Sequence, residues 1–252
     1  MLIGITTAPR PRNYVEATVR AIRAQISKEA ARVIVSPTLR DETVDWNGIR
    51  ALGCEVLPPL WDVTAEQKAK EVGTGIYQAP DQHRGLERNA ARLIRHMGSL
   101  SYPWFITMQD DLEFCVHALA RMHQVHQWLI QNEHATRHVG AVSFYTPYEE
   151  AGRANRTFWL YPRGKFYGDL CLLWRAARAR EYIDGQNLSN ANDLEIQKFF
   201  RERPGLLMLA HSPCLVQHVG HESATGKDPR AGQRCTMNFD ANHDATSHAK
   251  PF

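Results

Sequence analysis

The sequence predicts a single α/β domain, built on a mixed sheet of the Rossmann type whose central strands are parallel and flanked by helices. In the first half, short apolar runs alternate with stretches of helical periodicity, a pattern typical of β-α-β units with right-handed crossovers. The second half mixes strand and helix patterns less regularly. The 252 residues are 43% apolar and 23% charged, as in soluble globular proteins, and no linker or repeat divides them.

Three strands and two helices alternate at the start of the chain. Strands are expected at Leu2–Thr6, Val33–Ser36 and Cys54–Leu57. The first helix places apolar residues on one face, namely Val15, Val19, Ile22 and Ile26. A shorter helix is expected over 43–52. Residues 58–84 hold few periodic apolar residues and predict a long loop, which in a compact domain is usually functional.

Two further helices are expected on either side of a strand at Trp104–Met108, which precedes an acidic cluster. Trp104–Met108 is short and wholly apolar, as in strands at the centre of a sheet. The helix before it is marked by Leu86, Ala90, Leu93 and Met97, and the helix after it by Val116, Leu119, Met122, Val125 and Leu129. Later strands are expected at Val139–Phe144, Thr157–Tyr161, Phe166–Leu173, Leu206–Leu209 and Leu215–Val219, and later helices at Ala176–Ile183 and Asp193–Arg203.

Charge and cysteine content narrow the function classes. The net charge of 30 − 27 = +3 is too small to indicate nucleic-acid binding by itself. Arg outnumbers Lys by 23 to 7, which suits phosphate recognition but equally reflects codon bias. The five Cys residues never form a CxxC pair, so reduced thiols are expected. Without an apolar stretch of about 20 residues or a signal peptide, a cytoplasmic protein is expected.

An acidic cluster directly follows the apolar strand at 104–108. It consists of Asp110, Asp111 and Glu113. Ligands of open α/β sheets bind beyond the carboxyl ends of strands, and carboxylates this close together repel unless a cation lies between them. Hard oxygen ligands of this kind suit Mg²⁺ or Mn²⁺, with substrate phosphates completing the shell. The alternative is that Asp110 or Asp111 caps a helix beginning near residue 114.

Two later segments carry further candidates. His211, Cys214, His218 and His221 are a conceivable zinc set, although their spacing matches no common finger. His218, on a strand, is alternatively a single late metal ligand or a structural histidine. Asp193 and Glu195 open a helix. Asp193 is either a helix cap, as Asn192 is, or a general base facing a cleft.

An anion or nucleotide site is also predicted near the N-terminus. Thr6, Thr7 and Arg10 lie in the turn between the first strand and helix, where hydroxyl groups and a helix N-terminus favour anions. Arg84, Arg88 and Asn89 open the helix before the acidic strand and could reach phosphates. The alternative for each Arg is a solvated surface position. Neither a GxGxxG nor a Walker A sequence is present.

In this order, the elements resemble the GT-A class of nucleotide-sugar-dependent glycosyltransferases. The resemblance rests on Thr6-Thr7-Ala-Pro-Arg10, Gly85 with Arg88-Asn89, Gln109-Asp110-Asp111, Gly168-Asp169, Asp193 with Glu195, and Val216-Gln-His218-Val-Gly220. It implies a GT-A-like domain over 1–225, with a nucleotide-binding half at about 1–113 and an acceptor half at about 114–225. Residues 226–252 would form a polar tail or lid.

The resemblance also implies a role for each site residue. Asp111 would be the principal ligand of Mn²⁺ or Mg²⁺, helped by His218 and Glu113, and Asp110 would contact the donor ribose or the metal. Thr6, Thr7, Arg10, Arg84, Arg88 and Asn89 would bind the donor, a UDP-sugar by expectation. Asp193 would be the base, and Asp169 and Glu195 would lie on the acceptor side. Gln109-Asp110-Asp111 is not a literal DxD motif, and Asp111-Leu112-Glu113 fits the pattern formally, so the ligand register stays open.

Two rival functions and several acceptors remain. A nucleotidyltransferase also uses metal and carboxylates at a strand end, but needs a Gly-rich, Lys-bearing loop that this N-terminus does not match. A non-catalytic module would bind carbohydrate or nucleic acid by stacking on aromatic residues such as Trp159, Tyr161 and Tyr167. The acceptor could be a glycan, a small molecule or a hydroxymethylated DNA base, as for phage enzymes acting in the host cytoplasm. Basic residues that suit DNA are Arg153, Arg156, Arg163 and Lys165.

Overall fold

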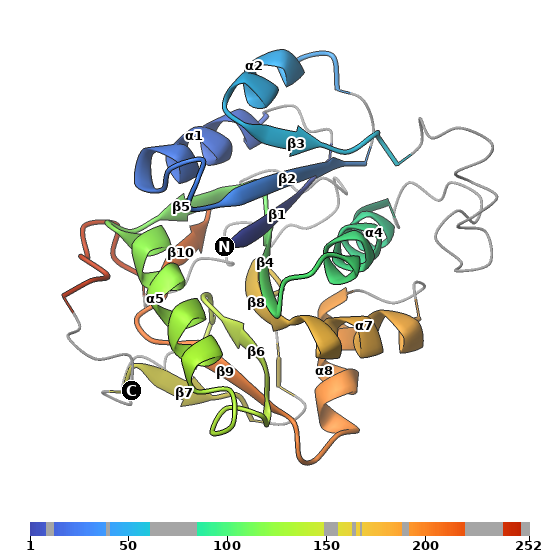
Figure 1. Ribbon diagram of the computed structural model, residues 1–252, viewed down its shortest axis with the longest axis vertical. Coiled ribbons are helices and arrows are strands. Elements are labelled where there is room, and N and C mark those ends of the chain that lie inside the picture. Colours follow the sequence, from blue (N-terminus) through green and yellow to red (C-terminus); the bar gives the residue numbers. More distant parts are fainter. Residues whose placement is uncertain are drawn as a thin grey trace.

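The computed structural model describes most of the chain (Figure 1). The described residues are 1–8, 13–38, 41–60, 85–148, 156–162, 165–166, 168–187, 192–219 and 239–247. Several predicted positions therefore lie outside the described residues, including Arg10 and Arg84 of the expected donor site, most of the loop at 58–84 and most of the tail. The alternative site residues Arg153, Arg163, Tyr167 and His221 also lie outside them.

The first half alternates strands and helices as predicted. Its elements are β1 (Leu2–Thr7), α1 (Val15–Gln25), β2 (Arg32–Pro37), α2 (Trp46–Ala51), β3 (Cys54–Val56), α4 (Gly85–Ser99) and β4 (Trp104–Gln109). The second half contains β5 (Leu112–Phe114), α5 (Ala118–Gln131), β6 (Val139–Ser143), β7 (Phe158–Leu160), β8 (Cys171–Arg175), α7 (Ala176–Gly185), α8 (Asn192–Arg201), β9 (Leu207–His211) and β10 (Val216–His218).

The described strands form one large mixed sheet and one small sheet. The large sheet has eight strands in the order β3-β2-β1-β4-β8-β6-β9-β7. Strands β3, β2, β1 and β4 are mutually parallel, β8 runs antiparallel between β4 and β6, and β9 is parallel to β6. The small sheet pairs β5 with β10. The predicted fold class, a mixed sheet with a parallel centre, is confirmed.

Helices cover both faces of the large sheet (Figure 1). One face packs against α1, α2 and α5 through buried residues such as Val19, Ile49 and Leu119. The other packs against α4, α7 and α8 through Leu93, Ala179 and Phe200. The apolar periodicity of each helix faces the strands, because burial of that stripe is the main gain in free energy on folding. Among the described residues, every helix is too short or too polar to cross a membrane.

The chain between β4 and α5 differs from the prediction. A helix was expected from about residue 114, but Leu112–Phe114 form β5, and α5 begins only at Ala118. Leu112 is buried and Glu113 exposed, which is the period-two alternation of a strand. This short signal was hidden by the helical pattern that starts at Val116. Val116 itself makes an isolated bridge to Asp244 and precedes the helix.

The predicted strand at Phe166–Leu173 begins later, at Cys171. Gly168 has φ +82, and a Cβ there would lie 2.9 Å from Tyr145 Cε1, so the backbone turns at this residue. The turn places Asp169 just before β8 rather than within it. Part of the predicted tail also packs on the domain: Ala245 is fully buried and its N–H donates to Val116 O at 3.0 Å.

His126 on α5 should make the fold acid-sensitive. Burial, assisted by the charges of the N-terminal amine and His123, lowers its pKa from 6.5 to about 4. Since the unfolded chain binds this proton more readily, the contribution to stability is complete above pH 6.5 and is lost as the pH falls toward 4. We expect His126→Phe to reduce the loss of unfolding free energy between pH 7 and 4.5 by about 2 kcal/mol, measured by urea denaturation. The exposed His134→Gln is the control, and an unchanged pH dependence in His126→Phe would contradict the assignment.

Candidate active site at the carboxyl edge of the sheet

The parallel strands β1, β2 and β4 end at the same edge of the large sheet. Thr7 pairs with Pro37 at the end of β2, and Thr6 pairs with Gln109 at the end of β4. The segments that follow these strands therefore meet, as is general in open α/β sheets. This edge gathers the threonines of the N-terminal turn and the acidic cluster, which lie about a hundred residues apart in the chain.

Asp110 is fastened to two other elements. Its side chain is 1% exposed, and its Oδ2 accepts a hydrogen bond from Thr7 Oγ1 at 2.5 Å. Its backbone oxygen accepts a hydrogen bond from Thr18 Oγ1 of α1 at 2.5 Å. The Thr6 hydroxyl donates a hydrogen bond to Met108 O at 3.3 Å, and Met108 precedes Gln109, the residue with which Thr6 pairs. The end of β4 is thereby held by β1 on one side and by α1 on the other.

Asp111 contacts His218, and both are residues that the resemblance names as metal ligands. The Asp111 Oδ2 and His218 Nε2 atoms are 2.9 Å apart, and the side chains are 1% and 7% exposed. The contact follows from the small sheet, in which β10 is antiparallel to β5 and His218 pairs with Leu112. Val219 N donates to Asp111 O at 3.0 Å, which extends the pairing to the aspartate. Residues 107 positions apart are brought together by a three-residue strand pair.

The capping alternative for the acidic cluster is wrong. Residues 112–114 are a strand, and α5 begins after His117, whose side chain makes no cap hydrogen bond. The two aspartate side chains instead bind a threonine hydroxyl and an imidazole from distant parts of the chain. The two aspartates therefore make their contacts at the edge of the sheet and do not cap the helix that follows.

Glu113 does not join this pair. It is exposed on β5 opposite Gln217, whereas Asp111 and His218 are buried. Within the described part of the chain, no three His, Cys, Asp or Glu side chains form a group that could hold a metal ion. Of the three ligands expected from the sequence, Asp111 and His218 are therefore in contact, and Glu113 lies apart from them.

The zinc alternative is not supported either. The His211 ring bonds to Arg121 Nε at 3.1 Å and lies 2.8 Å from Pro213 O. Cys214 contacts the backbone of Thr146. The described members of the proposed zinc set are each engaged in different parts of the structure and form no metal-holding group.

Asn89, expected to bind the donor, fastens strand ends. Its Oδ1 accepts from Ser36 Oγ at 2.7 Å, and its Nδ2 donates to Ser36 O at 2.6 Å and Thr7 O at 3.4 Å. Arg92, one turn later on α4, donates to Ser36 Oγ and to the carbonyl groups of Pro37 and Pro58. Arg88 on α4 is also buried, so the solvated-surface alternative is wrong for it. The start of α4 holds the ends of β1, β2 and β3 in place.

A second polar group lies where β4 meets the later helices. Gln109 Nε2 donates to Asp169 Oδ1 at 3.1 Å, and Asn192 Nδ2 donates to Asp169 Oδ2. Burial raises the pKa of Asp169, and the negative charge of Asp193 acts in the same direction. Asp193 is half-buried in the first turn of α8. Asp169 and Asp193 therefore lie near each other and near the end of β4.

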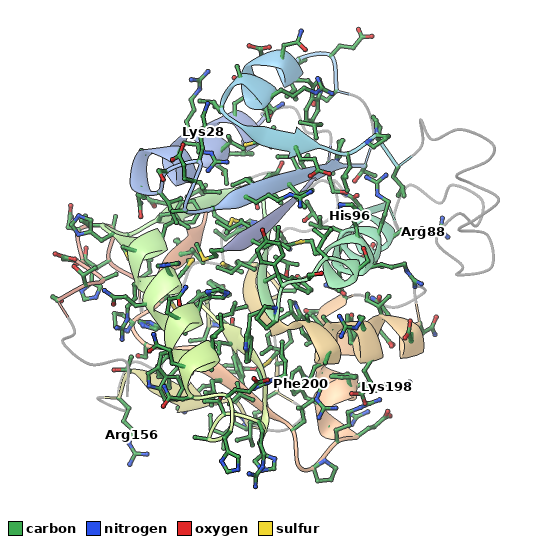
Figure 2. The ribbon with its side chains drawn as sticks, in the orientation of Figure 1. Lys28, Arg88, His96, Arg156, Lys198 and Phe200 are labelled. Atoms are coloured by element: carbon green, nitrogen blue, oxygen red, sulfur yellow. The ribbon has the colours of Figure 1, made fainter. Side chains whose placement is uncertain are left out.

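Glu195, expected on the acceptor side, is 4% exposed and its Oε2 accepts from Asn187 N at 3.2 Å. Figure 2 shows that α8 turns Phe200 toward the strands and Lys198 away from them. Arg156 and Lys165, the described members of the basic set, are exposed. The aromatic alternative is partly explained by packing, since Tyr161 is 5% exposed and contacts Trp159 and Phe166 edge-on.

Two cavities open along this edge. The larger, of about 540 Å³, is lined by the ends of β2 and β3 and by α2, including Pro37, Trp46, Arg50 and Pro58. Its volume lies in the range of small-ligand pockets. The smaller, of about 20 Å³, is enclosed by Thr6, Gln109, Asp169 and Asn192 together with apolar side chains.

Sequence reasoning missed Thr18, Ser36, Arg92 and Tyr182, because hydroxyl and Arg side chains on helices and strands give no local sign of a distant partner.

Comparison with known proteins adds structural neighbours only. No family model matches the chain, and neither does any curated protein. A mannosyltransferase from Pyrobaculum calidifontis, in complex with GDP-Man and Mn²⁺, is similar with TM-score 0.49 and 12% identity over 82% of this chain and 53% of that one. This chain thus spans about half the length of that protein.

Two further structures show the same level of similarity. Mouse xyloside xylosyltransferase 1 gives TM-score 0.42 and 12% identity, covering 83% of each chain. A CMP:2-keto-3-deoxy-manno-octonic acid synthetase complexed with CTP gives TM-score 0.44 and 11% identity, covering 83% of this chain and 88% of that one. Two of these three proteins are glycosyltransferases by name, the class that the sequence resembles. At such identities the likeness concerns the fold, so the function rests on this chain's own residues.

The role of Asn89 as a fastener predicts a loss of stability on its removal. Asn89→Ala deletes four buried hydrogen bonds, because the Asn89 side chain binds Ser36 Oγ, Ser36 O, Thr7 O and the Arg92 guanidinium. We expect the free energy of unfolding to fall by about 2 kcal/mol or more, measured by urea denaturation. Asn47→Ala on the exposed surface of α2 should change it by less than about 0.5 kcal/mol. Equal stabilities of the two variants would show that Asn89 is not structural.

Proposed function

We propose that this protein is a metal-dependent glycosyltransferase, which moves a sugar from a nucleotide-sugar donor to an acceptor hydroxyl. The observation that carries the proposal is the buried contact of Asp111 with His218 at the end of a central parallel strand. Asp110 stands beside it, fixed by Thr7. Anionic and imidazole ligands at this edge suit a cation that in turn binds a diphosphate.

The Asp111–His218 pair fits a divalent cation. Asp111 Oδ2 and His218 Nε2 are 2.9 Å apart and both side chains are buried, so one cation would be held by both residues. A carboxylate oxygen and a neutral imidazole nitrogen are both common metal ligands. Mg²⁺ and Mn²⁺ are often held by only one or two protein side chains, with substrate phosphates and water in the remaining positions. Two protein ligands are therefore sufficient for Mn²⁺ or Mg²⁺ bound together with a donor.

The donor would lie along the edge from the metal ligands toward β2 and β3. The 540 Å³ cavity at the ends of these strands has room for a nucleoside, with Trp46 and three prolines on its walls. Pro37 of this cavity pairs with Thr7, which binds Asp110, so the cavity and the acidic strand end lie along the same edge of the sheet. A UDP-sugar is the expected donor.

The reaction would use the two halves of the domain differently. The bound cation supplies charge stabilisation to the departing nucleoside diphosphate. Asp193, half-buried at the start of α8, would accept the proton of the acceptor hydroxyl. Asp169 already accepts two amide hydrogen bonds and keeps lone pairs for sugar hydroxyl groups. Attack by the acceptor on the side opposite the leaving group would invert the anomeric carbon.

The ligand register provides a direct test. Asp111→Asn keeps the shape of the side chain but removes its charge, so we expect Mn²⁺-dependent thermal stabilisation by nucleotide sugars to disappear and sugar transfer to fall by about 10³-fold. Glu113→Gln removes the same charge two residues away and should behave as wild type, because Glu113 is exposed and apart from His218.

The contrary results are equally specific. Loss of transfer in both Asp111→Asn and Glu113→Gln would support the Asp111-Leu112-Glu113 register, and full activity of Asp111→Asn would refute the proposed pair. Pyrophosphate release from nucleoside triphosphates by wild type, without sugar transfer, would assign a nucleotidyltransferase. Stabilisation by a glycan or DNA alone, with no cation requirement, would indicate a binding module.

The base role of Asp193 predicts a separable defect. Asp193→Asn removes the proton acceptor and leaves the strand end untouched, so transfer should fall by about 10²–10⁴-fold with unchanged metal-dependent binding of the donor. Initial rates of transfer and thermal shifts measure the two properties. Asp184→Asn, in the last turn of α7 and exposed, is the matched control. Full activity of Asp193→Asn would remove this residue from the mechanism.

A further inference from the structure

A continuous set of polar side chains joins the end of β4 to the later helices. Gln109 Nε2 donates to one oxygen of Asp169 at 3.1 Å, and Asn192 Nδ2 donates to the other. Asp169 lies immediately before β8, and Asn192 is the first residue of α8. The Asp169 carboxylate is thus held between the strand that ends in the acidic cluster and the helix that carries Asp193.

The orientation of the Asn192 amide is determined by its other partners. Asn192 is 8% exposed, and its Oδ1 accepts from Tyr182 OH at 2.6 Å and from Gln186 Nε2 at 3.1 Å. Because Tyr182 of α7 and Gln186, the residue after α7, both donate to the amide oxygen, the amide nitrogen faces Asp169. Rotation of the amide would break all three hydrogen bonds and oppose its oxygen to a carboxylate.

Tyr182 is itself immobilised by packing. Its ring is 1% exposed and stacks on Trp174 at 5.4 Å between centroids, with 13° between the planes. Trp174 belongs to β8, the strand that pairs with β4. The packing of Tyr182 on Trp174 therefore fixes the hydroxyl that orients Asn192. The contacts of these side chains connect β4, β8, α7 and α8.

A small cavity also joins this set to β1. Thr6 of β1 lines the 20 Å³ cavity together with Gln109, Asp169 and Asn192. Space of this size holds about one water molecule. Asp193, the next residue along α8, raises the pKa of Asp169 by its charge and so is also near.

We propose that Asn192 is a positioning residue: by binding Asp169, it fixes the start of α8, and with it the Asp193 carboxylate, against the end of β4. The inference rests on the proposed function for its catalytic consequence. Its structural content is the hydrogen-bonded clamp of Tyr182, Asn192, Asp169 and Gln109. A base misplaced by about 1 Å can cost about 10²-fold in rate without affecting the binding of the other substrate.

Kinetics of three variants test the catalytic consequence. Asn192→Ala should lower kcat of sugar transfer by about 10²-fold, with unchanged KM for the donor and unchanged Mn²⁺-dependent donor binding. Asn192→Asp keeps the volume but opposes a second carboxylate to Asp169, so an equal or larger loss is expected. Tyr182→Phe removes only the hydroxyl and should give a smaller loss of kcat. Asn132→Ala, at the end of α5 and far along the chain from the clamp, should match wild type.

Hydrogen–deuterium exchange tests the clamp without reference to activity. In Asn192→Ala and Tyr182→Phe, amides in the second turn of α8, which are the first to have intrahelical acceptors, should exchange at least about tenfold faster, while those of α1 and α4 stay as in wild type. Unchanged exchange at α8 would overturn the proposal. So would a rise in donor KM with normal kcat, since Asn192 would then act as a donor contact.

The proposed function and the Asn192 clamp are refuted by different results. Wild-type protein that transfers no sugar from any nucleotide-sugar donor would refute the proposed function, while the exchange result would still decide on the clamp. Rapid exchange throughout the molecule in Asn192→Ala would show general destabilisation. Tyr182→Phe, which retains its stacking on Trp174, then separates the clamp from the packing.

Discussion

The candidate site depends on the antiparallel pairing of β5 with β10. The chain leaves the centre of the large sheet at Gln109, passes two buried aspartates and at once forms a strand that recruits residues 216–218. This pairing places His218 against Asp111 and continues through the hydrogen bond from Val219 N to Asp111 O. Burial of adjacent carboxylates is costly unless polar partners or a cation compensate it, and the small sheet supplies one such partner.

Two helices on the same face of the large sheet, α4 and α8, bind different strand ends at one edge. Asn89 and Arg92 of α4 bind the ends of β1, β2 and β3 through side-chain and carbonyl groups. Asn192 of α8 reaches the end of β4 through Asp169 and Gln109. Rigid strands with polar side chains from helices fixed at their ends provide the preorganisation that a transfer reaction needs. The proposed donor and acceptor groups are therefore parts of one hydrogen-bonded framework.

Local patterns in the sequence predicted the sheet and its helices well where a single period dominated. The central strand at Trp104 and the helix faces at Val15 and Leu93 are examples. A long run or stripe of apolar residues can be buried in only a few arrangements, so its pattern determines the element. Prediction was wrong between residues 112 and 117, where a three-residue strand precedes a helix and its signal is shorter than the helical pattern beside it. The prediction also missed the contacts of Asn89 with Ser36 and Thr7, because an Asn near a helix start gives the same local pattern whether it binds a ligand or a strand end.

The sequence by itself determined the fold class, the acidic strand end and the types of residue available for a metal and a base. These follow from periodicity and from the order of residues along one segment. Only the tertiary structure decided that His218 joins Asp111, that Glu113 stands apart, and that Asn192 binds Asp169 rather than merely capping its helix. Each of these depends on strand register or on a contact between elements far apart in the chain, and such pairings are chosen by the packing of the whole domain.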